Sequence, residues 1–122
     1  MPGEIANISD TAFWVAVYRA MESERPDAHF HDPYARLLAG RHGEQIVRKL
    51  PFAKSAAWAM IVRTIVMDEF IMRCVNEGAG TVVNLAAGLD ARPYRLPLPA
   101  STQWIEVDLP DILTYKEEKL KN

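Results

Sequence analysis

The pattern of apolar positions divides the chain into a helical first part and a second part in which strands and helices alternate. Apolar residues recur at helical spacing in segments near 10–22 and 53–77, and Gly78 is well placed to end the longer of them. Between them we expect two shorter helical segments, near 33–38 and 46–50, which Gly40 and Gly43 interrupt. Two short runs rich in β-branched and aromatic residues then predict strands at 81–86 and 103–108. On one face of the first predicted helix we expect a buried stripe made of Phe13, Ala16, Val17, Ala20 and Met21.

This order predicts an α/β fold in two parts. Residues 1–78 form an N-terminal helical segment, and residues 79–122 form the first β–α–β–α of a doubly wound, Rossmann-like parallel sheet. Sheets usually have about four to six strands, so two strands do not make a stable open sheet. We therefore expect the chain to be the front part of a longer domain, unless another chain supplies the missing strands.

The end of the first predicted strand carries the main candidate site. The strand leads into Ala86-Ala87-Gly88, and Asp108 closes the second strand 20 positions after Gly88. A glycine turn followed about 20 residues later by an acid is the layout of a nucleotide-type site. A single glycine argues against the dinucleotide fingerprint, and it suits an adenosine ligand without a pyrophosphate, such as S-adenosylmethionine. On spacing alone, an ordinary strand–turn–helix without a cofactor remains open.

The segment around this turn, Val82-Val83-Asn84-Leu85-Ala86-Ala87-Gly88-Leu89-Asp90-Ala91-Arg92-Pro93-Tyr94-Arg95-Leu96, resembles motif I of the leucine carboxyl methyltransferase family, which includes bacterial polyketide O-methyltransferases. Other stretches are similar to that family in the same order, and the resemblance spans about Ser9 to Lys119. These stretches are Ser9-Asp10-Thr11-Ala12, Arg19-Ala20-Met21-Glu22-Ser23, Asp32-Pro33-Tyr34-Ala35, Arg63-Thr64 with Asp68, and Glu106-Val107-Asp108-Leu109-Pro110.

The resemblance implies a role for each of four residues. Arg63 would pair with the carboxylate of S-adenosylmethionine, Ala86 and Gly88 would line its methionine part, and Asp108 would bind its ribose. The family pattern often has glycine where this chain has Ala86. Each role also has a structural alternative: Arg63 could be a solvated helix arginine, and Asp108 could cap the helix that Pro110 opens.

The implied activity is O-methylation of a carboxylate or a hydroxyl on a small-molecule acceptor. A carboxylate needs no general base, whereas a hydroxyl does. Two other functions stay open. One is a non-catalytic fragment that associates with itself or with a partner through an exposed sheet edge. The other is a nucleotide-binding oxidoreductase, which the missing glycines disfavour.

Composition limits the remaining possibilities. The net charge of −2 gives no electrostatic case for nucleic acid or for an anionic membrane. The single cysteine, Cys74, suits a reducing compartment, and we expect a cytoplasmic protein. His29 and His31 alone are a poor ligand set, so we expect no metal site.

Overall fold

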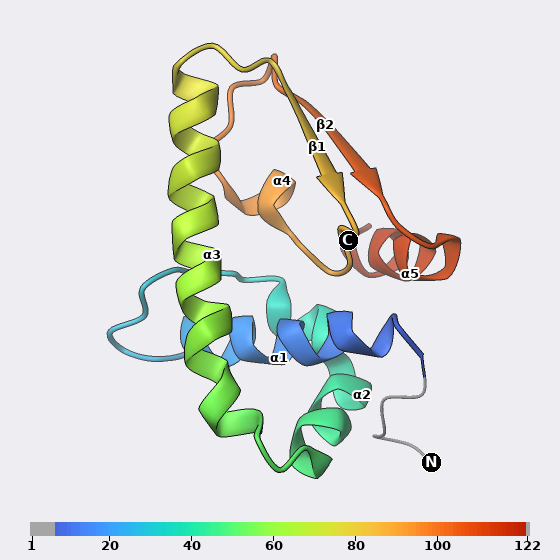
Figure 1. The fold of residues 1–122 in the computed structure, drawn as a ribbon. Helices are drawn as coiled ribbons and strands as arrows, with labels where there is room; N and C mark the ends of the chain where they lie inside the picture. The colour runs from blue at the N-terminus through green and yellow to red at the C-terminus, as the bar shows by residue number, and fades with distance from the viewer. Residues whose placement is uncertain (1–6, 122) are drawn as a thin grey trace.

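The computed structural model describes residues 7–121, except the side chains of residues 53 and 54 (Figure 1). It confirms the predicted order of helices and strands, except that the two short segments expected near 33–38 and 46–50 form one helix with non-helical backbone at Gly40. The elements are α1 (Asp10–Ser23), α2 (Ala35–Lys49), α3 (Ala53–Asn76), β1 (Thr81–Leu85), α4 (Arg92–Arg95), β2 (Gln103–Val107) and α5 (Pro110–Leu120). Within the described residues, no helix is both long enough and apolar enough to cross a membrane.

The two strands form a small parallel sheet. Thr81 pairs with Gln103 at one end and Leu85 pairs with Val107 at the other. Both strands therefore finish side by side, and Figure 1 shows both arrowheads directed toward α1 and α5. The carboxyl ends of adjacent parallel strands are where open α/β sheets place ligands. The mixed helix and parallel-strand architecture predicted from the sequence is thus confirmed.

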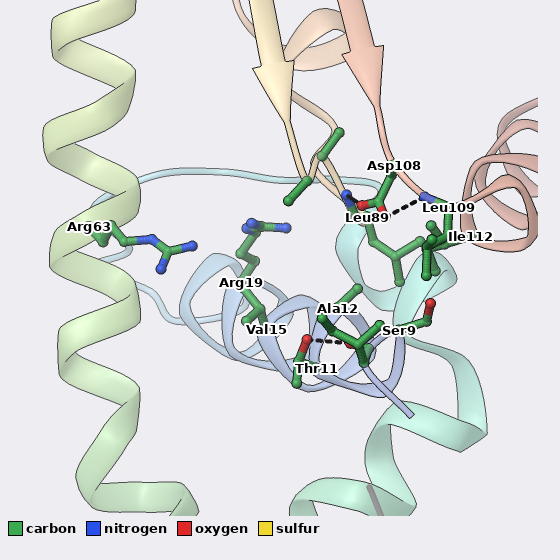
Figure 2. Close-up of a pocket in the computed structure, with 14 residues that line it drawn as sticks. Ser9, Thr11, Ala12, Val15, Arg19, Arg63, Leu89, Asp108, Leu109 and Ile112 are labelled. Carbon is green, nitrogen blue, oxygen red and sulfur yellow. Dashed lines mark hydrogen bonds between the residues drawn. The ribbon is translucent and has the colours of Figure 1, made fainter. Parts of the chain in front are cut away.

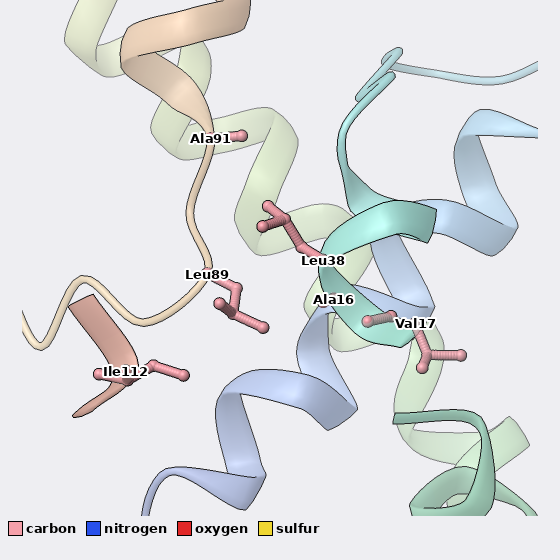
Figure 3. Packing of buried hydrophobic residues seen from close by; sticks show 7 residues of the cluster. Ala16, Val17, Leu38, Leu89, Ala91 and Ile112 are labelled. Atoms are coloured by element: carbon pink, nitrogen blue, oxygen red, sulfur yellow. The ribbon is translucent and has the colours of Figure 1, made fainter. Parts of the chain in front are cut away.

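The hydrophobic core joins the two parts of the chain. Figure 3 shows side chains of α1 and α2 meeting residues that follow β1 and β2. The buried cluster is Ala16, Val17, Leu38, Ala39, Leu89, Ala91 and Ile112. Leu89 and Ala91 come from the segment just after the glycine turn, so packing on α1 and α2 fixes where that turn lies. The division of the chain at residues 78 and 79 stays a prediction, and the core contains residues from both sides of it.

One predicted core position is wrong, and apolar residues on other helices are also exposed. Met21, predicted on the buried stripe of α1, is exposed, and so is Leu37 on α2. Along α3 the exposed residues include Trp58, whose exposed fraction is 68%, and Phe70. Periodicity finds the apolar face of a helix, but only the neighbouring elements decide how much of that face is covered. No described element covers the full width of these faces.

The start of α1 carries a reciprocal pair of capping hydrogen bonds. Ser9 makes no side-chain cap hydrogen bond. Instead Asn7 and Asp10 form a reciprocal pair, in which the Asp10 N–H donates to Asn7 Oδ1 and the Asn7 N–H donates to Asp10 Oδ2, each at 3.2 Å. This is the geometry of a capping box, with its two residues three positions apart.

Candidate cofactor-binding site

A cleft of about 280 Å³ lies where α1, α3, the ends of both strands and the start of α5 come together (Figure 2). All four residues predicted from the sequence, Arg63, Ala86, Gly88 and Asp108, line this one cleft. Residues of α1 form another wall, among them Ala12 and residues 15 and 19. The structure therefore brings together the helix, the turn and the acid that the sequence singled out separately.

The turn after β1 has an unusual backbone. Ala86 has φ of 54° and Gly88 has φ of 53°, both in the left-handed region. Glycine adopts this conformation freely, whereas alanine is strained there. The Gly88 N–H donates to Asp108 Oδ2 at 2.6 Å, and the Ala87 N–H donates to the carbonyl oxygen of Val107 at 3.2 Å. These two bonds hold the turn against the end of β2.

Asp108 lines the cleft and also links the two segments that follow the strands. Its Oδ1 accepts a hydrogen bond from the Leu109 N–H at 2.7 Å, and its Oδ2 accepts the bond from Gly88. The N-cap of α5 is Leu109, and no side-chain cap bond is made there. The carboxylate therefore joins the turn after β1 to β2, and each of its oxygens retains a lone pair for a ligand hydroxyl.

Two guanidinium groups stand at the other end of the cleft. Figure 2 shows Arg63 extending from α3 and Arg19 from α1, with their charged ends toward one another. Burial lowers the pKa of Arg19, an effect that the nearby carboxylate of Asp90 opposes. Arginine stays charged in either case, so two cations line the cleft.

A second compartment, of about 230 Å³, continues from the first. The two share the lining residues Val15, Arg19, Arg63, Ala86 and Ala87. Beyond this shared wall, Met60, Thr64 and Met67 of α3 face residues 84, 85, 90 and 92. The arginines therefore stand between the two compartments.

The model of the leucine carboxyl methyltransferase family matches residues 12–122 of this sequence. The chain belongs to that family. Relatives with the provisional name S-adenosyl-L-methionine-dependent methyltransferase occur in Parafrankia sp., which is 40% identical over 123 residues, and in Rhodococcus jostii, which is 39% identical over 122 residues. A protein of the same provisional name from Mycobacterium tuberculosis is 37% identical over 126 residues.

These matches cover 94%, 95% and 93% of this chain, but only 40%, 42% and 42% of the relatives. The chain thus spans about two fifths of the length of the curated relatives that it matches. The resemblance inferred from the motifs is confirmed at the level of the family.

In this member of the leucine carboxyl methyltransferase family, an ion-pair network holds the motif I segment in place. Arg92 donates to Asp68 at 2.7 Å and to Asp90 at 2.6 Å, and Arg95 contacts both oxygens of Asp68 at 2.8 Å. Asp90 also accepts the Arg92 N–H at 2.8 Å and the Asn84 side-chain amide at 3.0 Å. The predictions that Asp90 caps the segment starting at Ala91 and that both arginines pair with nearby acids are confirmed.

Sequence reasoning missed Arg19. It lies on α1 between the buried positions Ala16 and Ala20, and a single arginine in an amphipathic helix carries no signal of its own. The resemblance already included the stretch 19–23, so the motif contained the residue without assigning it a role. Its place in the cleft depends on how α1 packs on the turn after β1, which is a long-range contact.

Proposed function

We propose that this chain carries the S-adenosylmethionine site of an O-methyltransferase, and that the cleft between α1, α3 and the ends of β1 and β2 is that site. The observation that carries the proposal is the meeting of Gly88 and Asp108 in one cleft with two guanidinium groups at its other end. The family assignment and the provisional names of the relatives agree with this donor.

The residues present fit such a ligand. Gly88 has no side chain, and Ala86 and Ala87 have small ones, so a ligand in the cleft can approach the backbone of the turn closely. The oxygens of Asp108 suit ribose hydroxyls at one end. A carboxylate between Arg19 and Arg63 would be held by charge-assisted hydrogen bonds at the other. We assign both arginines to the carboxylate end of the donor, which extends the role expected for Arg63 alone.

We propose that the acceptor is a small molecule methylated on oxygen, with a carboxylate favoured over a hydroxyl. When bound, the donor would supply a methyl group from its cationic sulfur, and the sulfur would leave as part of a neutral thioether. The main task of the residues around the cleft is to hold the two reactants in line and to exclude water. Within the described residues, no histidine, lysine or glutamate lines either compartment. Asp108 and Asp90 are engaged with backbone amides and Arg92, so a carboxylate, which needs no base, fits best.

We place β1 and β2 as the first two strands of a doubly wound, Rossmann-like sheet. Their parallel pairing and the ligand-sized cleft at their carboxyl ends support this placement. Both strands lie within the family match.

One observation favours association as a second property. One face of the sheet is apolar and exposed: the exposed fractions are 55% for Val83, 71% for Leu85, 40% for Ile105 and 48% for Val107. Parallel sheets are normally covered on both faces. We therefore propose that this face takes part in an association of the chain, either with itself or with a partner.

Isothermal titration calorimetry with S-adenosylhomocysteine and with NAD tests the cofactor assignment. We expect the first ligand to bind one site and the second to give no heat of binding. Binding of NAD alone would favour a nucleotide-binding oxidoreductase. Binding of neither ligand by a folded chain would contradict the donor site.

A further inference from the structure

Lys116 is a buried cation next to the candidate cofactor site. It lies on α5, one turn after Ile112, which belongs to the core and lines the first cleft. Only 1% of Lys116 is exposed. Lysine is almost never buried to this degree unless its charge is paired. The contacts of its ammonium group therefore indicate its role.

The ammonium group joins three segments of the chain. Lys116 Nζ donates to the carboxylate of Glu106 on β2 at 2.6 Å, and this ion pair compensates the buried charge. Nζ also donates to the carbonyl oxygen of Asp90, in the turn after β1, at 3.1 Å. One side chain of α5 thus binds both β2 and the turn. Lys116 lines neither compartment, so any effect on a ligand passes through these two partners.

Asp90 is the residue at which the turn is anchored. Its N–H donates to the carbonyl oxygen of Ala87 at 3.1 Å, and its carboxylate accepts hydrogen bonds from Asn84 at 3.0 Å and from Arg92 at 2.6 Å. Lys116 adds the bond to the carbonyl oxygen of Asp90. These bonds fix the later part of the turn, whose earlier part lines the first cleft.

The ion pair also encloses Asp108. Glu106 lies two residues before Asp108, and α5, which carries Lys116, begins two residues after it. The bond between Glu106 and Lys116 therefore closes the segment that presents Asp108 to the cleft. Because Lys116 holds Asp90 as well, it fixes the turn and Asp108 relative to one another from behind the cleft.

We propose that Lys116 is a positioning residue of the candidate cofactor site. Through Asp90 and Glu106 it sets the distance between the turn after β1 and Asp108, on which the binding of a nucleoside ligand depends. Binding groups that are held in place beforehand lose less conformational freedom when a ligand binds. This inference rests on the proposed function, because the ligand that reports it is taken from there.

The alternative is that the ion pair only stabilises the fold. Removal of one partner of a buried ion pair is destabilising, whereas neutral residues of similar volume in place of both partners cost little. If Lys116 only stabilised the fold, the affinity for a ligand would follow the stability of each variant. The two roles can be separated, because one variant can be made more stable than another and yet less well positioned.

Two variants of the full chain, Glu106→Gln alone and Glu106→Gln combined with Lys116→Met, test the proposal. In the single variant Lys116 loses its carboxylate partner but can still donate to Asp90. The double variant removes the buried charge together with that bond. In urea denaturation we expect the double variant to be the more stable of the two. In calorimetric titration it should nevertheless bind S-adenosylhomocysteine at least about fivefold more weakly, the effect of one lost hydrogen bond.

A second measurement needs no ligand. A short hydrogen bond to a carboxylate moves an amide proton signal downfield, so the Gly88 amide signal in nuclear magnetic resonance reports the 2.6 Å bond to Asp108. We expect this signal to lie further upfield in the double variant than in Glu106→Gln. Lys121→Met is the control, because Lys121 is exposed at the C-cap of the same helix. It should leave the stability, the affinity and the Gly88 signal unchanged.

Two results would overturn the proposal. One is a double variant that binds S-adenosylhomocysteine at least as tightly as Glu106→Gln does, so that affinity follows stability. The other is a Gly88 signal that is the same in both variants. The donor assignment is judged separately: if the parent chain does not bind S-adenosylhomocysteine while the Gly88 signal moves as expected, Lys116 positions the turn and the donor assignment fails.

Discussion

A Cβ atom added to Gly88 would lie 3.1 Å from the Cβ atom of Ala12, so the turn after β1 is in direct contact with α1. That distance is shorter than ordinary van der Waals contact, and Gly88 also has a φ of 53°. Two independent constraints therefore require glycine at this position: the backbone conformation and the close approach of a helix.

Gly88→Val should consequently damage both stability and binding. A residue with a side chain in the left-handed region costs about 1–2 kcal/mol, and the contact with Ala12 adds to that cost. We expect the free energy of unfolding to fall by at least about 2 kcal/mol in urea denaturation, and the binding of S-adenosylhomocysteine to be lost. Gly80→Ala is the control, since a Cβ atom there meets nothing within 4 Å. Similar losses in both variants would show that the contact with Ala12 is not what matters.

Asp108→Ala tests the proposed ribose contact. Loss of a charged acceptor costs about 1.5–3 kcal/mol, so we expect affinity for S-adenosylhomocysteine to fall roughly 10- to 150-fold in calorimetric titration. Asp111→Ala removes a nearby exposed acid in the first turn of α5 and should leave affinity unchanged. Because Asp108 also accepts the Gly88 N–H, circular dichroism must show that the variant is folded. Unchanged affinity in a folded Asp108→Ala variant would remove this residue from the site.

Most of the secondary structure could be predicted from local sequence patterns. The two strands and the helix that Pro110 opens were predicted to within a residue, because β-branched runs and proline positions act locally. Asp108 and Gly88 were paired correctly because parallel strands bring their carboxyl ends together. This part of the site follows from chain order alone.

The rest of the site depends on contacts that no local pattern encodes. Arg19 reaches the cleft only because Ala16 and Val17 on the neighbouring face of α1 pack in the core against Leu89. The exposed positions Leu37 and Phe70 fit a helical stripe as well as buried ones do, because periodicity shows a face without showing its neighbour.

Ala86→Gly should stabilise the turn. Alanine at a φ of 54° is strained by about 1–2 kcal/mol, and the extra freedom that glycine gives the unfolded chain offsets about 0.5–1 kcal/mol of the relief. We expect the free energy of unfolding to rise by up to about 1 kcal/mol in urea denaturation. Ala87→Gly is the matched comparison, because Ala87 is buried and its φ is not positive; it should destabilise. Equal destabilisation by both changes would show that the Ala86 conformation carries no strain.

The exposed face of the sheet gives a prediction about association. Val83→Lys places a charge in the middle of the apolar surface made by Val83, Leu85, Ile105 and Val107, and it should abolish any concentration-dependent association. The measurement is size-exclusion chromatography with light scattering at several protein concentrations. Val62→Lys on α3 is the control, because Val62 is also an exposed valine but lies outside the sheet. If the parent chain stays monomeric at all concentrations, self-association through this face is wrong, and only binding of a different protein would remain for it.

Asp32 and Asp90 should give opposite pH dependences of stability. Burial raises the pKa of Asp32, which is 3% exposed, above its ordinary value of 3.8, and the charges of Arg95 and Arg19 only partly oppose this. Burial also acts on Asp90, but there the Arg92 and Arg19 guanidiniums hold the pKa below 3.8. A raised pKa of an acid in the folded state means that its contribution to stability is present at low pH and is lost as pH rises through that pKa. A lowered pKa means the reverse.

We therefore expect the stability of Asp32→Asn, measured against the parent chain by urea denaturation, to become relatively better as pH rises from about 4 to 7. Relative to the parent chain, Asp90→Asn should become worse as pH rises through the acid range below about 4. An asparagine side chain can change the free energy of unfolding by an amount that does not depend on pH. That amount does not affect the test, because the test compares only how the stability difference between variant and parent chain changes with pH. If the stability difference between variant and parent chain changed with pH in the same direction for both variants, the assignment would be wrong. The assignment is that ionised Asp32 opposes folding and ionised Asp90 supports it.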